Sequence, residues 1–337
     1  MKPISDPLQR FWYSSDTPPL SLRLLSWLFV AAAAGRRRWQ KQQARRTPLG
    51  LPVIVVGNIN VGGSGKTPFV IWLVERLREW GWHPGIVSRG YGGRAGATPR
   101  LVAGESNPAE CGDEPVLMAR RLGCPVVVCP DRVAAVRALT RLGQVDVVIS
   151  DDGLQHYRMA RKLEFAVVDG TRGLGNGYRL PAGPLRESSG RLAEVNLTVV
   201  NGGGWKPPPL LNAPVLCMRL TGTHAVAIAG SHTKPLAQFA GETVHAVAGI
   251  GNPTRFFSML TQLGIKLVVH PFPDHHSYRP EDFAFGDDRP VLMTEKDAVK
   301  CQPFADARMW SVPVQAQITV EDTARVRELI ATLNKEI

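Results

Sequence analysis

Apolar residues recur along the chain in two spacings, which predict strands that alternate with helices. Unbroken apolar runs rich in β-branched residues predict strands at 52–57, 85–90, 125–129, 146–150, 165–169 and 195–201. Helical spacing is clearest over 69–80, where Val70, Leu73, Val74 and Leu77 share one face. Apolar strands alternating with helices are typical of a parallel sheet covered on both faces. We therefore expect an α/β fold for this part of the chain.

A second α/β pattern follows the proline-rich segment 205–209. It predicts strands at 244–248, 265–270 and 291–294, and helices at 255–263 and 320–334. A length of 337 residues also favours two domains over one. We expect an N-terminal arm at 1–46, a first domain at 47–210, and a smaller α/β domain at 211–337 whose last helix packs back on the first.

The N-terminal arm has an uncharged apolar run at 24–35, followed directly by Arg36, Arg37 and Arg38. As a helix this run would span about 18 Å, which is shorter than the roughly 30 Å of a bilayer core. Trp27 and Trp39 are residues that favour the headgroup level. We expect a helix that lies in the membrane interface, held by basic residues against anionic lipid. A tilted spanning helix, a buried helix and a signal peptide remain as alternatives.

The positive charge of the chain is concentrated in this arm. Residues 1–50 hold nine basic and two acidic residues, a net +7 of the chain's +11. The remainder has no broad basic stripe, so we expect no nucleic-acid partner. The five cysteines form no Cys-x-x-Cys pair, which indicates a reducing compartment without structural zinc or disulfides.

The strand at 52–57 leads through a glycine-rich loop into the helix at 69–80. The loop matches a phosphate-binding loop, whose backbone N–H groups and lysine surround the phosphates of a nucleotide. The expected nucleotide-binding residues are Asn60, Val61, Gly62, Gly63, Ser64, Gly65, Lys66 and Thr67. Asn60 stands where the general pattern has glycine, and we expect asparagine to tolerate a left-handed backbone there. A glycine-rich turn without a ligand is the alternative.

Two adjacent carboxylates, Asp151 and Asp152, end the strand at 146–150. In phosphate-loop enzymes a strand-terminal aspartate holds Mg²⁺ beside the loop, together with the loop's Ser or Thr hydroxyl. We therefore expect Mg²⁺ at Thr67 and at Asp151 or Asp152, although a plain turn after a strand has the same sequence. Glu187 is a further candidate for the metal or for a polar network, and a solvated loop charge is as compatible with its position.

Two other polar clusters contain candidate site residues. Asp113 and Glu114 precede a helical run, where carboxylates often act only as caps. Asp274, His275 and His276 are adjacent, and a histidine beside a carboxylate suits acid–base chemistry. The second cluster lacks an obvious third metal ligand, and an ordinary polar loop is its alternative.

Taken together, the motifs resemble those of the tetraacyldisaccharide 4′-kinase family, the lipid A 4′-kinases of Gram-negative bacteria. The resemblance rests on residues 57–68 (GNINVGGSGKTP), 88–93 (SRGYGG), 112–115 (GDEP), 151–157 (DDGLQHY), 180–187 (LPAGPLRE), 248–253 (AGIGNP), 274–275 (DH) and 293–298 (MTEKDA). These motifs are long and in order, and Asn60 is normal for this family.

The resemblance implies transfer of the ATP γ-phosphate to the 4′-hydroxyl of a tetraacylated glucosamine disaccharide 1-phosphate, with Mg²⁺. It implies a phosphate-loop domain and a smaller C-terminal α/β domain, with the site in the cleft between them. Asp113 matches the proposed general base, and His275, preferred over His276, matches its partner. A lipid acceptor also implies work at the cytoplasmic face of the bacterial inner membrane, in agreement with the arm.

Two other functional classes remain possible from the residues alone. A membrane-tethered regulatory NTPase would use 195–201 for base recognition, but the Asn-Lys-x-Asp motif of guanine-binding proteins is missing. A phosphate-loop kinase of a soluble metabolite would keep full activity without residues 1–46.

Overall fold

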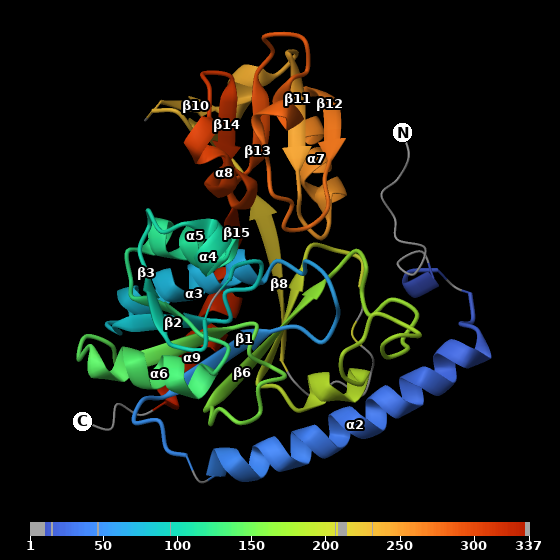
Figure 1. Ribbon diagram of the computed structural model, residues 1–337, viewed down its shortest axis with the longest axis vertical. Helices are drawn as coiled ribbons and strands as arrows, with labels where there is room; N and C mark the ends of the chain where they lie inside the picture. The colour runs from blue at the N-terminus through green and yellow to red at the C-terminus, as the bar shows by residue number, and fades with distance from the viewer. Residues whose placement is uncertain are drawn as a thin grey trace.

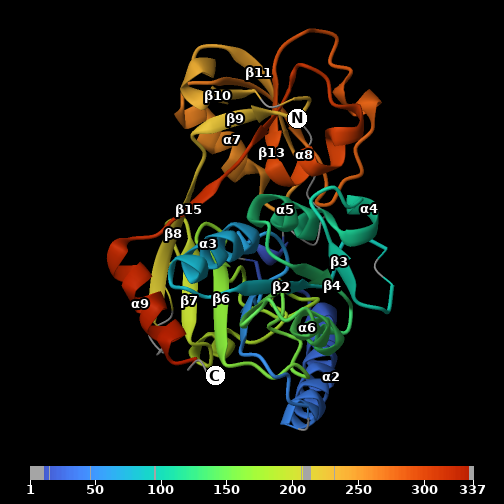
Figure 2. The same cartoon turned by 90° about the vertical axis from the view of Figure 1, so that its left-hand side faces the viewer.

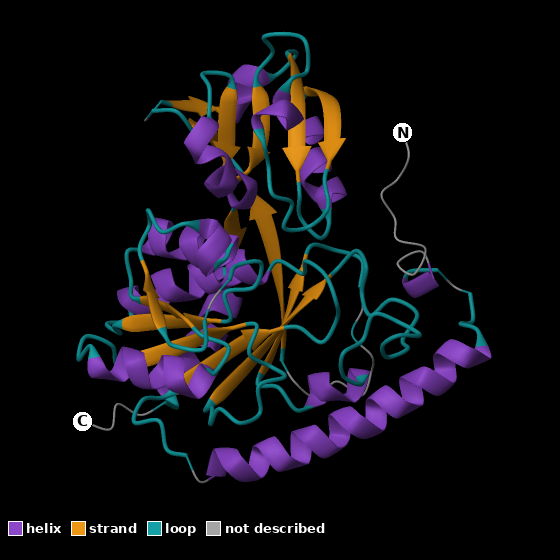
Figure 3. Ribbon diagram, in the orientation of Figure 1, coloured by secondary structure: helices purple, strands orange, loops and turns teal. Residues whose placement is uncertain are grey.

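The computed structural model describes residues 11–14, 16–45, 47–94, 96–205, 207, 214–230 and 232–333. Most of the predicted linker at 205–209 and the last residue of the predicted helix 320–334 lie outside the described residues. Within the described part, the strands form a nine-stranded and a six-stranded sheet, one above the other in Figure 1. Figure 3 shows helices packed around both sheets. The predicted α/β class is confirmed.

The larger sheet is mainly parallel and has the phosphate-loop strand in its interior. Its order is β15-β8-β7-β6-β1-β5-β2-β4-β3, antiparallel only at the two edge pairs β15·β8 and β3·β4. The strands are β1 (Val53–Gly57), β2 (Pro84–Ser88), β3 (Arg100–Val102), β4 (Val126–Val128), β5 (Val147–Asp151), β6 (Leu163–Asp169), β7 (Leu197–Asn201), β8 (Val215–Thr221) and β15 (Gln315–Gln317). Because β1 pairs with both β5 and β6, the loop after β1 opens beside the ends of those strands.

Helices cover both faces of this sheet, as the apolar strands predicted. They are α3 (Lys66–Glu79), α4 (Pro108–Cys111), α5 (Asp113–Leu122), α6 (Arg132–Arg141) and α9 (Val320–Ala331), with the 3₁₀ turn Ser189–Ala193. Phe69 and Leu77 of α3 belong to one core cluster, and Val133 and Leu139 of α6 to another. The helix expected from residue 69 begins at Lys66, because the phosphate loop runs straight into its first turn.

The smaller sheet carries the C-terminal site residues. Its order is β10-β9-β14-β13-β11-β12, with β14, β13, β11 and β12 mutually parallel. The elements are β9 (His224–Ala227), β10 (Thr233–Pro235), β11 (Thr243–Ala248), α7 (Pro253–Gln262), β12 (Lys266–Pro271), β13 (Val291–Thr294), α8 (Glu295–Cys301) and β14 (Met309–Val312), with 3₁₀ turns at Leu236–Phe239, Pro280–Phe283 and Gln302–Phe304. The predicted β-α-β order of 244–270 is present.

The chain passes between the two sheets twice. β8 pairs with β7 in the larger sheet before the chain enters the smaller one, and β15 returns to pair with β8. Helix α9 then packs on the larger sheet, with Val326 and Ile330 in its core (Figure 2). The boundary after residue 210 falls among undescribed residues and stays a prediction.

Helix α2 (Leu20–Arg45) runs along the outside of the larger domain (Figure 1). It continues through the basic cluster, so the observed helix is longer than the apolar run on which the prediction was based. Residues at helical spacing face the protein body, and two of them, Ser26 and Gln40, are buried. Leu24, Trp27 and Leu28 are 59%, 77% and 69% exposed. Among the described residues, no helix has the length and apolarity to cross a membrane.

Candidate functional site

The phosphate loop is shaped by two glycines with positive φ and by contacts from neighbouring strands. The φ angles of Gly62 and Gly65 are 105° and 91°, and Gly65 directly precedes the first turn of α3. The Asn201 amide donates to the Ser64 carbonyl at 3.0 Å, and a methyl group on Gly65 would lie 2.1 Å from that amide nitrogen. The loop is therefore held open around the start of α3, the geometry in which backbone N–H groups bind an anion.

Asn60 contributes in a different way from the one expected. It is absent from the residues with positive φ, so the left-handed backbone predicted there is wrong. Its side-chain amide instead donates to the Gly173 carbonyl at 2.8 Å, and its backbone bridges to Leu185. Asn60 thus ties the phosphate loop to the loop after β6, which requires a side chain that glycine does not have.

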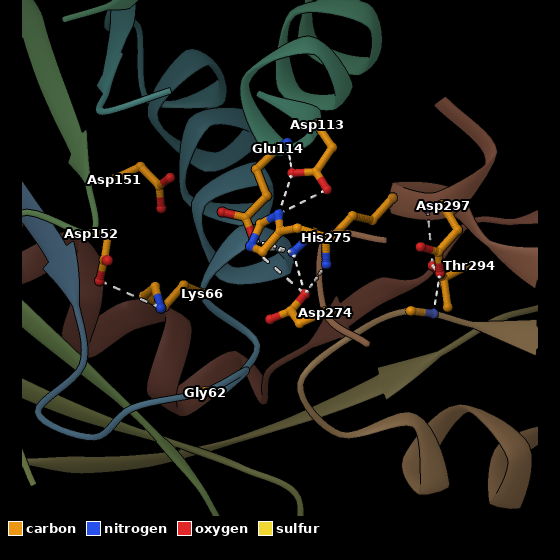
Figure 4. Close-up of polar contacts among 12 residues, drawn as sticks. Gly62, Lys66, Asp113, Glu114, Asp151, Asp152, Asp274, His275, Thr294 and Asp297 are labelled. Atoms are coloured by element: carbon orange, nitrogen blue, oxygen red, sulfur yellow. Dashed lines mark hydrogen bonds and ion pairs between the residues drawn. The ribbon is translucent and has the colours of Figure 1, made fainter. Parts of the chain in front are cut away.

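Lys66 and the two strand-terminal aspartates face one another at the start of α3 (Figure 4). The Lys66 ammonium lies 3.5 Å from the Asp152 carboxylate, which also pairs with Arg186 at 3.3 Å. Burial opposes the ionised form of Asp152, but the charges of Lys66 and Arg186 lower its pKa to about 2. Asp152 is therefore an anion at neutral pH.

Asp151 is buried with less compensation. Ser88 donates to its Oδ2 at 3.3 Å, and its Oδ1 has no hydrogen-bond partner. Burial and the charges of Glu114 and Asp152 raise the pKa of Asp151 to about 7. A buried carboxylate oxygen without a partner is costly unless a cation binds it.

These residues fit a magnesium ion. The unpartnered Asp151 Oδ1 belongs to a residue that lines the same cavity as Thr67, and Mg²⁺ in phosphate-loop sites needs only one or two carboxylates because phosphates and waters complete its shell. Accordingly, the described residues contain no cluster of three or more His, Cys, Asp or Glu side chains that would form a full protein cage.

Glu187 is drawn into a polar network beside the cavity. Its carboxylate accepts hydrogen bonds from Tyr157 and, at 2.8 Å, from Gln155, and it lies 3.6 Å from the Arg191 guanidinium. These partners occupy both of its oxygens. The arrangement favours the network role over the metal role, which stays an untested prediction.

Asp113 and His275 come from different domains and meet directly (Figure 4). Asp113 begins α5, and His275 lies in the loop after β12 with φ 60°. The His275 Nδ1 lies 3.1 and 3.0 Å from the two carboxylate oxygens of Asp113. The ring of Tyr91, from the loop after β2, packs edge-on against His275. The two residues, which lie 162 positions apart in the sequence, are therefore brought together.

The two groups shift each other's protonation. Burial opposes ionisation of Asp113, but the hydrogen bond from His275, followed by the charge of Lys296, lowers its pKa to about 2. Burial also opposes the charged form of His275, but the hydrogen bond to Asp113 outweighs it, and the pKa of His275 is raised. The pair therefore behaves as one titrating unit.

His276, the alternative to His275, points elsewhere. Its Nε2 lies 3.0 Å from Asp282, and its ring packs against Phe272 and Tyr278. These contacts belong to the smaller domain. Its surroundings favour a structural role for His276.

Several site residues were not identified from the sequence. Lys296 and Lys300 of α8 reach across to α5: Lys296 bonds to Glu114 at 2.9 Å, and Lys300 lies 3.6 Å from Asp113. The motif at 293–298 contained Lys296, but nothing local indicated which partner its side chain would meet. Glu114, which resembled a helix cap, is instead an ion-pair partner across the domain interface.

A second set of contacts joins the domains at the phosphate loop. Arg255 of α7 pairs with the buried Asp169 at 2.7 Å, and Arg172 donates to the Gly251 carbonyl at 2.7 Å. The backbones of Gly63 and Gly251 are in contact, since a methyl group on Gly251 would lie 2.3 Å from the Gly63 nitrogen. The smaller domain therefore covers the phosphate loop directly.

A cavity of about 1080 Å³ connects these groups. It is lined by the phosphate loop, by both strand-terminal aspartates, by His275 and Lys296 of the smaller domain, and by α2 residues that include Val30 and Ala33. Asp113 does not line it, whereas His275, which contacts Asp113, does. A phosphate-binding end and an apolar helical wall thus belong to one cavity.

Known proteins resemble this chain over most of its length. The model of the family described as tetraacyldisaccharide-1-P 4′-kinase matches residues 19–335. A tetraacyldisaccharide 4′-kinase of Alkalilimnicola ehrlichii is 50% identical over 334 residues, covering 97% of this chain and 98% of that protein. One of Methylobacillus flagellatus is 48% identical over 330 residues, covering 97% and 96%. The crystal structure of LpxK from Aquifex aeolicus, described as an "apo" form in complex with ATP, has a TM-score of 0.74 and 28% identity, covering 93% and 98%.

Proposed function

The chain belongs to the tetraacyldisaccharide-1-P 4′-kinase family, and from this premise we propose which residues carry out the reaction. It is an ATP-dependent kinase that phosphorylates the 4′-hydroxyl of a tetraacylated disaccharide 1-phosphate, giving the 1,4′-bisphosphate. The predicted activity is confirmed, and it replaces the two alternatives of a regulatory NTPase and a kinase of a soluble metabolite.

At the donor end, residues 60–67 bind the ATP phosphates, with Lys66 beside the transferred group. The shape of the loop and the largely buried side chain of Lys66 support this role. Asp151 and Thr67 would hold Mg²⁺, which when bound would supply positive charge to neutralise the phosphates. Asp152, paired with Lys66 and Arg186, sets the position of the lysine.

At the acceptor end, the Asp113–His275 pair accepts the proton of the 4′-hydroxyl. Its direct contact across the domain interface is the observation that carries this proposal. The resemblance names Asp113 as the base. The positions of the side chains favour His275 as the member that meets the hydroxyl, with Asp113 orienting the ring, because only His275 lines the cavity. Activity then depends on the two domains being together.

The cavity that the donor and acceptor residues share supports the assignment of both ends, and phosphoryl transfer tests it. We expect ³²P to pass from ATP to purified tetraacyldisaccharide 1-phosphate in the presence of Mg²⁺. A deacylated disaccharide 1-phosphate serves as the control and should be a much poorer acceptor. Equal rates on the two acceptors would contradict a role for the apolar wall.

We further propose that α2 holds the enzyme on the cytoplasmic face of the inner membrane. A narrow stripe of α2 that includes Ser26 and Gln40 is buried against the protein, whereas its leucines and tryptophans face outward. A helix that packs on a protein core has the opposite arrangement, with its apolar residues facing the core. Ser26 donates to the Arg179 carbonyl at 2.9 Å, and Arg37 pairs with Glu194, so the helix is fixed in this orientation. The outward face suits the boundary between headgroups and acyl chains.

Replacing two outward-facing residues, Leu24→Asp and Trp27→Asp, should weaken membrane binding. Each aspartate would have to enter the apolar boundary, so we expect at least about tenfold less binding to vesicles containing anionic phospholipid. Co-sedimentation with vesicles measures this. Gln42→Asp, which adds a charge at an exposed position near the polar end of the same helix, is the matched control. Unchanged binding by the double variant would contradict the proposed orientation.

A further inference from the structure

Lys296 lies where charged side chains from both domains converge on His275. Its ammonium bonds to Glu114 at 2.9 Å and to Asp274 at 3.0 Å, and it lies 3.4 Å from the His275 Nε2. The Lys296 side chain is 14% exposed. Glu114 belongs to α5 of the larger domain, whereas Asp274 and His275 belong to the loop after β12. One largely buried cation therefore contacts both sides of the domain interface beside the proton-accepting pair.

The chemistry of these groups selects one form of the imidazole. An ammonium group has only donors, so a ring nitrogen that faces it has to present its lone pair. This leaves the His275 Nε2 without a proton and places the ring proton on Nδ1. The Nδ1–H then donates to Asp113, which lies 3.0 Å away. The result is a neutral imidazole whose Nε2 lone pair faces Lys296 and the cavity that both residues line.

The charge of Lys296 is itself stabilised by its partners. Burial opposes the charged form, but Glu114, Asp113 and Asp274 outweigh it and raise the pKa of Lys296. Lys296 therefore remains a cation wherever the pair titrates. It is not a proton donor to His275 but a fixed charge beside it.

We propose that Lys296 is a positioning residue that holds His275 in the tautomer able to accept a proton at Nε2. The inference rests on the proposed function of the Asp113–His275 pair and deepens it. Asp113 alone favours a doubly protonated ring, because a carboxylate stabilises imidazolium. Lys296 opposes that charge from the other side of the ring. Both neighbours are needed to give an imidazole that is oriented and also neutral.

Removing Lys296 changes the charge around His275 in a known direction. The groups that face the ring are Asp113 from α5, Asp274 from its own loop, Lys296 from α8 and the uncharged Tyr91 ring. Lys300 lies near Asp113, 3.6 Å from the carboxylate. Without Lys296, His275 is left between two carboxylates, and its pKa rises. His275 then becomes protonated at a higher pH, so on acidification the enzyme loses its base at a higher pH.

The test compares pH profiles of kcat/KM for the full chain carrying Lys296→Met or Lys296→Arg. For Lys296→Met we expect a kcat lower by about tenfold or more, and an acid limb moved upward by roughly one pH unit. Lys296→Arg keeps the charge and should keep the acid limb near its original position. Lys266→Met, at an exposed lysine of the same domain, should leave rate and profile unchanged. A lower rate for Lys296→Met with an unmoved limb would overturn the inference.

A measurement without a lysine variant covers the case in which Lys296→Met does not fold. In the ¹⁵N-histidine-labelled chain, with His275 identified by comparison with His275→Asn, we expect a pyridine-like Nε2 and a pyrrole-like Nδ1 above the acid limb. A pyrrole-like Nε2 would overturn the inference. A different result would refute the proposed function: wild-type transfer by His275→Asn. If His275→Asn is inactive but the wild type has a pyrrole-like Nε2, only the role of Lys296 is refuted.

Discussion

Lys66→Ala should reduce phosphoryl transfer by at least about 10³-fold. The ammonium of Lys66 is the positive charge that the phosphate loop directs at the transferred group. Its side chain is 12% exposed and pairs with Asp152, so it is held in place before any substrate binds. A truncated side chain leaves the negative charge of the transition state without this partner, and no other lysine lines the donor end of the cavity among the described residues.

Initial rates of ³²P transfer, measured at saturating lipid with varied ATP, check this prediction. Lys66→Arg, which keeps the charge but not its point-like shape, should recover only part of the activity. Lys266→Ala is the matched control for loss of a lysine. Thermal unfolding shows whether Lys66→Ala folds. A folded Lys66→Ala enzyme with a rate within tenfold of the wild type would be incompatible with the proposed donor site.

The donor half of the site was predictable because it is local in sequence. A β-branched run, a glycine-rich loop and an amphipathic helix follow one another directly, and each is recognised by short-range spacing. Asp151 and Asp152 were predictable for a similar reason, since the ends of parallel strands meet at one edge of a sheet. The exact role of Asn60 was not, because its partner Gly173 lies 113 positions away.

The acceptor half depends on long-range contacts, which leave no signal in the local spacing of apolar residues. Asp113 and His275 were separate candidates from the sequence, but their pairing was identified only through the family resemblance, because 162 residues separate them. The contact of Lys296 with the site was not predicted, because its partner Glu114 lies in the other domain. The return of the chain through β15 likewise depends on edge pairing with β8, which a three-residue strand does not signal. For α2, the sequence predicted an interfacial helix, but only packing shows that its leucines and tryptophans face away from the protein whereas Val30 and Ala33 line the cavity.

Asp113→Asn and His275→Asn should each lower kcat by about 10²–10⁴-fold while ATP binding stays intact. The amide that Asp113→Asn introduces cannot accept and orient the Nδ1–H as a carboxylate does, and His275→Asn removes the lone pair at the cavity. In the wild type the acid limb of kcat/KM should lie above the ordinary histidine pKa, because the hydrogen bond to Asp113 raises the pKa of His275 despite burial. Transfer is then lost as the pH falls through that raised value, since a protonated ring accepts no proton.

His276→Asn is the matched control for this pair. It removes the neighbouring imidazole, whose Nε2 lies by Asp282 instead of Asp113, so most of the activity should remain even if stability falls. Calorimetric titration with ATP separates chemistry from binding in all three variants. If Asp113→Asn loses ATP affinity in proportion to its rate, Asp113 acts in nucleotide binding and not in proton transfer. If both variants of the pair bind ATP normally but differ in residual rate by more than about tenfold, the more damaging substitution identifies the member that meets the acceptor hydroxyl.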